Sequence, residues 1–356
     1  MIIKKLNFNH YKTIKKFLKN NNSRLPRNRS WISFNNITNK NSSFYMDGLF
    51  KNNKIVGYHS VIEKIILFKK KKYKIFVSSN WNVSKKYRRG SFFLINNYFR
   101  QKSDLFLTTT ANQKASKIWM SLGGIAVNSQ SSKIALYQVL NYFKLIKNYF
   151  QNKGINFIPN FLIHFIVILI NIFFVKKNTH HLTSNLNFKK INKNSLKLEN
   201  FNKIFEANCS YPLEQRSKFI LNRYISSLEL NNKKVFVYQI VHQNIMVGYF
   251  VLVKEKYRGI NRIFFGEVRI FKKYEKKINE ILSFANLIAK KNNCTYIYYR
   301  NLRPNILKKI DFKNFSISKY DFNPYIIKIG SKKAEKLRKY LQNNWGTSYL
   351  DGDCLL

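Results

Sequence analysis

The chain carries the same hairpin pattern twice, and this repeat constrains its fold more than any other feature. Residues 51–58 form a polar stretch that enters an apolar run, and residues 242–249 repeat the same order. Asparagine at a turn between alternating strand residues is typical of a β-hairpin. The two runs share the order apolar-apolar-Gly-Tyr, and Gly57 and Gly248 stand 191 positions apart.

The elements that follow each hairpin also recur in order. In both halves we expect a long strand, then a helix with apolar residues at helical spacing, then a short strand. Leu105 and Tyr296, in the two short strands, are again 191 positions apart. A constant offset indicates structural duplication, although any two α/β units share this order. The expected ranges are 74–83, 91–101 and 104–108 in the first half and 262–270, 275–291 and 295–299 in the second.

Two stretches of the first half resemble the GNAT superfamily of N-acetyltransferases. Residues 81–90 are similar to the strand-to-helix turn of that family, and residues 112–124 keep the spacing of its Asn-x-x-Ala segment; a weaker echo covers 235–315. The resemblance implies an α/β (α+β) fold of two tandem GNAT-like domains, each a mixed central sheet flanked by helices. Tandem GNAT proteins of surface-polysaccharide gene clusters are similar, and Fem-like transferases are similar more distantly.

The resemblance also implies a division of the chain. We expect a GNAT-like domain over 1–133, a hydrophobic helical insertion over 134–178, a linker over 179–200 and a degenerate GNAT-like domain over 201–356. Residues 155–175 contain no charged side chain and reach the length of about 20 residues that spans a bilayer. One span would separate the two copies, so we expect packing across the domains or a place in the membrane interface, with spanning as the alternative.

By the resemblance, the first copy takes acetyl-CoA or another acyl-CoA as co-substrate. A helix start presents backbone N–H groups and the positive end of the helix dipole, which suits the pyrophosphate of coenzyme A. The pantetheine arm would then lie near the start of the 112–124 segment. The implied cofactor-binding residues are Val83, Arg88, Arg89, Gly90, Ser91 and Asn112.

Two positions depart from the family pattern. The second glycine of the family turn is absent after Gly90, so the arginines would supply charge in place of close backbone approach, or Phe92 would block the site. Trp119 stands where many members have a tyrosine that acts as general acid, and an indole cannot do this. In the second copy residues 299–305 stand in place of the second segment and its ending becomes Asp311-Phe312, so we expect this copy to be a scaffold or an acceptor-binding half.

The few acidic residues limit the candidates for a general base. Glu267 lies on the long strand of the second copy, and Glu63 and His59 share one phase of a strand in the first. A half-buried carboxyl could act as a base, and the alternative for each is an ion pair with a nearby lysine. The histidines show no metal-binding spacing and the three cysteines form no CxxC pair, so we expect neither a metal nor a disulfide framework.

The C-terminal Asp351-Gly352-Asp353 sequence is unusual in so basic a chain. It is similar to the ending of some GNAT-like proteins of polysaccharide clusters. Asp351 and Asp353 are therefore candidates for binding the hydroxyls or amine of a sugar substrate. The alternative is a turn in which the aspartates cap the backbone.

The formal net charge of +49 is compatible with either a nucleic acid or an anionic membrane as a partner. Basic surfaces collect phosphates, but 51 of the 65 basic residues are lysine, whereas specific nucleic-acid recognition favours arginine. We expect a cytoplasmic N-acyltransferase that uses an acyl-CoA and acts on an amine of a sugar or cell-envelope precursor, with possible peripheral contact to the inner face of an anionic membrane. The alternatives are a Fem-like transferase that uses aminoacyl-tRNA and a non-catalytic binding protein.

Overall fold

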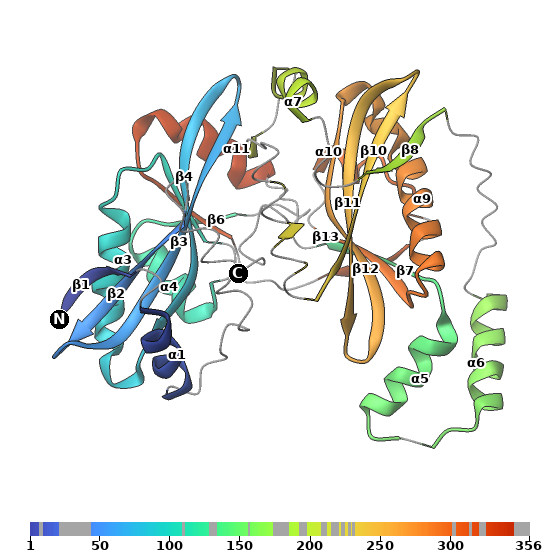
Figure 1. The fold of residues 1–356 in the computed structure, drawn as a ribbon, viewed down its shortest axis with the longest axis horizontal. Helices are drawn as coiled ribbons and strands as arrows, with labels where there is room; N and C mark the ends of the chain where they lie inside the picture. Colours follow the sequence, from blue (N-terminus) through green and yellow to red (C-terminus); the bar gives the residue numbers. More distant parts are fainter. Residues whose placement is uncertain are drawn as a thin grey trace.

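The structure is a computed structural model of the chain (Figure 1). It describes residues 1–6, 10–20, 44–108, 111–127, 134–155, 157–173, 185–191, 198–207, 212–214, 221, 225–226, 229, 232–300, 304–312, 315–319 and 325–344.

Two mixed sheets form the two halves of the molecule, as the sequence predicts (Figure 1). Within each sheet the strands are antiparallel except at one central pair, β4 with β5 and β12 with β13. In spatial order the first sheet contains β1 (Ile2–Leu6), β2 (Phe44–Lys51), β3 (Lys54–Phe68), β4 (Lys71–Val83), β5 (Leu105–Thr108), β15 (Ile326–Ile329) and β6 (Ile125–Ala126), with β9 (Leu213–Glu214) beside β3. The second contains β14 (Ser316–Lys319), β7 (Ile134–Val139), β13 (Tyr296–Arg300), β12 (Ile260–Ile270), β11 (Ile245–Tyr257), β10 (Lys234–His242) and β8 (Asn187–Ile191).

Helices cover both faces of each sheet. Apolar residues of α1 and α11 pack on one face of the first sheet, and those of α3 and α4 pack on the other. The second sheet is covered by α9 on one face and by α7 on the other, where Leu67 of β3 joins the same cluster. The helices are α1 (Tyr11–Asn20), η2 (Lys85–Gly90), α3 (Ser91–Phe99), α4 (Gln113–Ser121), α5 (Tyr142–Asn152), α6 (Asn160–Phe173), α7 (Leu198–Ala207), η5 (Lys272–Lys277), α9 (Ile278–Lys291), α10 (Pro304–Leu307), η7 (Lys332–Ala334) and α11 (Glu335–Asn344).

The repeat seen in the sequence extends to single hydrogen bonds. Ser84 N–H donates to the Val56 carbonyl over 2.9 Å, and Phe271 N–H donates to the Val247 carbonyl over 3.0 Å. The hairpin residues keep the offset of 191, whereas the residues that end the long strands and begin the next helix are 187 apart. The first hairpin is therefore four residues longer. The bulges are nevertheless in equivalent places. Each hairpin has a β-bulge just before its glycine, and the long strands β4 and β12 each have a second β-bulge near the end.

Gly57 and Gly248 are required by the close approach of the neighbouring strand. A Cβ atom at Gly57 would lie 3.1 Å from the Asn82 carbonyl oxygen, and one at Gly248 would lie 2.5 Å from the Arg269 carbonyl oxygen. Any larger residue would push the hairpin away from the end of the long strand. This is why the apolar-apolar-Gly-Tyr sequence recurs in the two copies.

The two sheets exchange one strand each. β15, from near the C-terminus, lies between β5 and β6 in the first sheet, and β7, from the first half of the chain, lies between β13 and β14 in the second. Helix α11 follows β15 and packs in the same half as the N-terminal strands (Figure 1). The expected division of the chain at residue 133 stays a prediction about domains, but the sheets themselves are shared across it.

The segment 134–178 is only partly helical. It begins with strand β7 because residues 134–139 pair with β13 and β14, where sequence reasoning placed the start of a helical insertion. The helices α5 and α6 follow, and the described part of the apolar stretch contains α6. Across the residues that the structure describes, no helix has the length and apolar character needed to cross a membrane.

The strand exchange predicts where a mutation near the C-terminus acts. Leu337 of α11 is fully buried in the first sheet's core, so Leu337→Ala should lower the free energy of unfolding by about 2–5 kcal/mol. Amide hydrogen exchange should accelerate in β4 and β5, although these strands lie far away in the sequence. Leu287→Ala, at an exposed position of α9, is the control and should change little. If amide hydrogen exchange became faster only in the second sheet, the placement of β15 and α11 in the first half would be contradicted.

Candidate acyl-CoA site

The central parallel strands separate near the same point in each sheet. β4 pairs with β5 only from Ile75 to Ser78, although β4 continues to Val83. β12 pairs with β13 only over Arg262 to Phe264, and it continues to Ile270. A gap in the ladder between two central strands leaves backbone groups that a ligand's amide groups can pair with.

A bulge lies on the long strand just beyond this point in each copy. Between the pairs His59–Trp81 and Val61–Ser78, β4 has one residue more than β3, and in the second copy Gly266 is the extra residue on β12. Bulges leave a residue outside the regular pairing and are common next to active sites, where they re-aim backbone and side-chain groups. Separation and bulge together define the candidate site of each copy.

In the first copy a basic helix start follows this strand. η2 begins after Ser84, whose side chain does not cap it, and runs directly into α3. Arg88 and Arg89 are exposed. The Ser91 N–H donates to the carbonyl oxygens of Arg88 and Arg89, so it is used within the helix. The uncapped N–H groups are therefore at the start of η2, a few residues before the position that the sequence suggests.

Gly90 is buried against β2, and Phe92 is exposed beside it. Gly90 has φ −63°, and a Cβ atom there would lie 2.4 Å from Leu49 Cδ2, so packing against β2 accounts for this glycine. Phe92 is 52% exposed, so its ring is not packed into the core beside the helix start. Val83 is half-buried at the end of β4, beside Gly57.

In the second copy an acidic residue stands at the matching position. Glu275 is equivalent to Arg88 at the offset of 187, and it is 2% exposed. Its carboxylate accepts hydrogen bonds from Asn305 Nδ2 over 2.6 Å and Lys309 Nζ over 2.7 Å. At this position the second copy therefore has a carboxylate paired with Lys309 where the first copy has an exposed arginine, so it offers no guanidinium to a phosphate group there.

His59 lies at the point where β4 and β5 separate. It is fully buried, its Nε2 is 2.7 Å from Ser78 Oγ, and its ring contacts Trp81 and Tyr98. Burial, and then the charge of Lys5, lower the pKa of His59 to about 3. The imidazole is therefore neutral at physiological pH, and so weak a base is poorly suited to general-base catalysis. His59 fits a hydrogen-bonding role beside Ser78 better than the expected role as a base.

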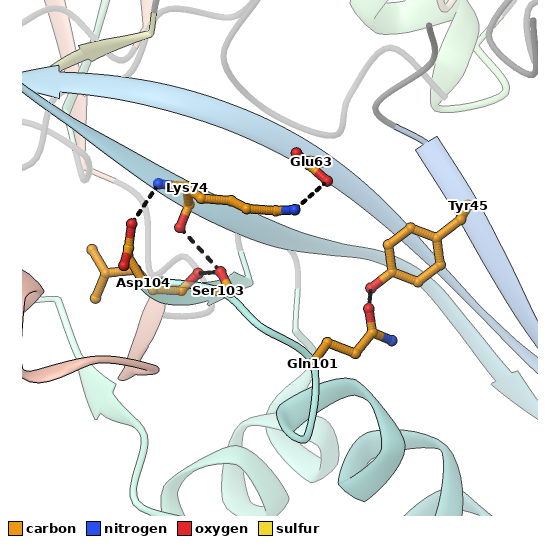
Figure 2. A network of polar contacts seen from close by, with 7 residues as sticks. Tyr45, Glu63, Lys74, Gln101, Ser103 and Asp104 are labelled. Carbon is orange, nitrogen blue, oxygen red and sulfur yellow. Dashed lines mark hydrogen bonds and ion pairs between the residues drawn. The ribbon is translucent and has the colours of Figure 1, made fainter. Parts of the chain in front are cut away.

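Glu63 shares a face of β3 with His59, but it is held in an ion pair. Its Oε2 is 3.0 Å from Lys74 Nζ, and both side chains are partly exposed (Figure 2). The backbone of Lys74 belongs to a second set of contacts: its N–H donates to Asp104 Oδ2 over 2.8 Å and its carbonyl accepts from Ser103 Oγ over 3.1 Å (Figure 2). These contacts support the ion-pair alternative for Glu63.

Glu267 is buried in the other sheet. It accepts hydrogen bonds from Tyr249 OH and from Arg269 Nε, each over 2.9 Å, and the ion pair with Arg269 is almost completely buried. This carboxylate balances the buried charge of Arg269, so its removal would leave that charge without this partner in the core. The structure therefore does not bring Glu267 together with Glu63 and His59, and the catalytic role of each stays a prediction.

The second motif of the first copy contributes a helix cap and a core residue. Asn112 Oδ1 accepts the Ala115 N–H over 2.9 Å, so it caps α4, which leaves its exposed amide N–H₂ group for a ligand. Trp119 is completely buried against Tyr98 and Phe99. A side chain in this position packs the core, in agreement with the expectation that it is no general acid. Asp351 and Asp353 lie outside the described residues.

Sequence reasoning missed a buried carboxylate close to His59. Asp47 of β2 pairs across the strands with His59 and is 1% exposed. Its Oδ1 lies 2.7 Å from Lys5 Nζ, and its Oδ2 accepts from Asn97 Nδ2 over 3.0 Å. The signal was present, because Asp47 interrupts a largely apolar strand. No group of three potential metal ligands occurs within the described ranges.

Solved structures with the same fold are known. A GCN5-related (GNAT) N-acetyltransferase from Anabaena variabilis superposes with a TM-score of 0.57 at 11% identity, over 93% of this chain and 73% of that one. The chain has the GNAT fold. A tandem GNAT protein from the clavulanic acid biosynthesis pathway matches at TM-score 0.52 and 10% identity, over 93% of this chain and 99% of that one. Saccharomyces cerevisiae N-myristoyltransferase, solved with bound myristoyl-CoA, matches with a TM-score of 0.51 at 12% identity. The match covers 91% of this chain and 79% of that one.

Searches by sequence add nothing to this comparison. No protein-family model matches the chain, and no curated protein matches it significantly. The structural neighbours confirm the expected tandem GNAT fold and show the fold alone, because their sequences are so different from this one.

The contacts of the two glutamates lead to opposite expectations for stability. Glu267→Leu leaves Arg269 buried without this carboxylate and should lower the free energy of unfolding by about 3–5 kcal/mol. Glu63→Leu removes a partly exposed ion pair and should cost less than about 1 kcal/mol. Denaturant unfolding of both variants measures the difference. A Glu267→Leu protein as stable as the wild type would show that this carboxylate is not structural and would favour its catalytic role.

Proposed function

We propose that the chain is an N-acyltransferase that binds an acyl-CoA in its first copy and not in its second. The observation that carries the proposal is the difference at one repeated position. The first copy has the exposed Arg88 and Arg89 in the turn that joins η2 to α3, and the second has the buried, paired Glu275 at the equivalent position. Two arginines favour a pyrophosphate at this position, whereas a fixed carboxylate opposes one.

The neighbouring elements fit the other parts of an acyl-CoA. The pantetheine arm would lie between the separated ends of β4 and β5, where its amides would pair with backbone groups that leave the β4–β5 ladder. Asn112 can offer its amide N–H₂ group to the arm, because its oxygen caps α4. The thioester would then reach the bulge on β4, where the backbone is irregular and can donate a hydrogen bond to the carbonyl oxygen.

Direct transfer is the reaction that this arrangement supports. The neutral amine of the acceptor attacks the thioester carbon, the C–S bond breaks, and the coenzyme leaves as a thiolate. The proton lost by the amine passes to water or to a carboxylate. Trp119 cannot protonate the thiolate, and His59 is too weak a base to serve the amine, so the work of the chain is positioning and charge stabilisation.

The finer identity of the acceptor is a further part of this proposal. An amine on a sugar or a cell-envelope precursor is suggested by the sequence of Asp351 and Asp353 and its likeness to proteins of polysaccharide biosynthesis. Such a precursor and acyl-CoA would meet in the cytoplasm or at the inner face of the membrane. A second acyl donor is consistent with the net charge of +49, because a basic surface binds the phosphates of a tRNA. This donor is an aminoacyl-tRNA, as in Fem-like transferases.

The proposal predicts that two matched double variants behave differently. Arg88→Ala/Arg89→Ala should weaken acetyl-CoA binding at least about tenfold, because a charge-assisted hydrogen bond contributes roughly 1.5–3 kcal/mol. Lys276→Ala/Lys277→Ala removes two charges from the equivalent turn of the second copy and should leave the affinity within about twofold. Isothermal titration calorimetry measures both.

Three outcomes would overturn the proposal in different ways. Equal weakening by both double variants would mean that the coenzyme responds only to the overall charge of the chain. Loss of binding in the second-copy variant alone would move the site to the second copy. Binding of deacylated tRNA but not of acetyl-CoA or longer acyl-CoAs would favour the Fem-like reaction.

A further inference from the structure

Helix α6 has an apolar face that the rest of the described chain leaves exposed. Phe161, Phe165 and Ile172 are 70%, 58% and 67% exposed. They follow one another at the spacing of a single helix face, and Ile163, on the opposite side, is buried. Exposed contiguous apolar surface of this kind marks an interaction site. The other large apolar side chains exposed on α6 are Leu162, Ile168 and Leu169.

The helix is presented at the periphery of the molecule. α5 and α6 extend from the second sheet, on the side away from the first sheet (Figure 1). Asn148 of α5 donates to the Arg258 carbonyl over 2.9 Å at the end of the β11–β12 hairpin. The ring centroids of Phe143 in α5 and His164 in α6 are 4.5 Å apart, and the tilted rings join the two helices. Helix α6 therefore lies at the outer edge of the half that contains the second sheet (Figure 1).

The charged side chains of the segment that contains α5 and α6 are all positive. Lys144, Lys147 and Lys153, on and just after α5, are exposed. The sequence contains no acidic residue between Asp104 and Glu199. A protein partner's basic residues would find no carboxylate here, and a second copy of the chain would bring another +49 charge to the contact. An anionic surface with an apolar interior satisfies both the apolar face and the lysines.

We propose that the α6 face binds the surface of an anionic phospholipid bilayer. The helix lies in the plane of the interface, the six apolar side chains enter the acyl-chain boundary, and the lysines contact the headgroups. This agrees with α6 being too short to cross a bilayer, since fourteen residues rise about 21 Å against roughly 30 Å of hydrocarbon. The inference is independent of acyl transfer, because it uses no residue of the first sheet.

Vesicle co-sedimentation of the full chain tests the proposal. The vesicles contain equal parts of phosphatidylcholine and phosphatidylglycerol, and binding is measured at low and at high salt. A chain of this charge would bind anionic vesicles at low salt even without α6, so the high-salt measurement decides. Phe161→Ser/Phe165→Ser is the test variant, and Ile245→Ser/Ile317→Ser, which removes two exposed apolar side chains elsewhere, is the control.

The expected result is specific to the α6 variant. Wild type and control should remain bound at high salt, and the α6 variant should bind at least about tenfold more weakly, since burial of one Phe side chain contributes more than a tenfold step. All three proteins should unfold at the same denaturant concentration, because the substitutions are exposed. Retained binding of the α6 variant would overturn the proposal.

Self-association is tested in the same proteins. If sedimentation velocity without vesicles showed a wild-type dimer that the α6 variant loses, the second copy would be the occupant and the proposal would be wrong. A monomeric wild type that pellets only with anionic vesicles supports it. Equal low-salt binding to pure phosphatidylcholine and to the anionic vesicles would overturn the requirement for anionic lipid.

Discussion

The exchange of β7 and β15 is the interaction on which the rest of the structure depends. Each strand completes a sheet in the other half, because β15 joins β5 to the edge strand β6 and β7 joins β13 to the edge strand β14. Backbone hydrogen bonds made across the exchange satisfy groups that burial would leave costly, and α11 adds its apolar face to the first core. Neither half can therefore form its complete sheet from its own part of the chain.

This constraint explains how one copy can lose a site without losing its fold. β15 pairs with β5, and β5 is the strand that separates from β4 at the candidate acyl-CoA site. The second copy thus contributes a structural strand to the site of the first. In the second copy the equivalent turn contains Glu275, which is buried and held by Asn305 and Lys309. In the proposed function, the second copy contributes packing and the first copy supplies the charge that binds the coenzyme.

The sequence predicts the features that depend on local pattern. Gly57 and Gly248 identify the two hairpins because a glycine next to a strand end is a local requirement of each repeat. The exchange of β15 could not be predicted, because two short apolar strands with similar patterns can pair in either sheet. The match of Arg88 to Glu275 was hidden by the change of offset from 191 to 187, and the burial of Glu275 depends on residues of α10 and beyond.

Amide hydrogen exchange with and without saturating acetyl-CoA tests the central claim most directly. The account predicts slower exchange at the end of β4, in η2 and in the first turn of α3, and no change in η5 and the first turn of α9. Protection of residues 81–95 alone would show that the first copy holds the coenzyme. Protection of residues 268–282 alone, or of neither region, would contradict it.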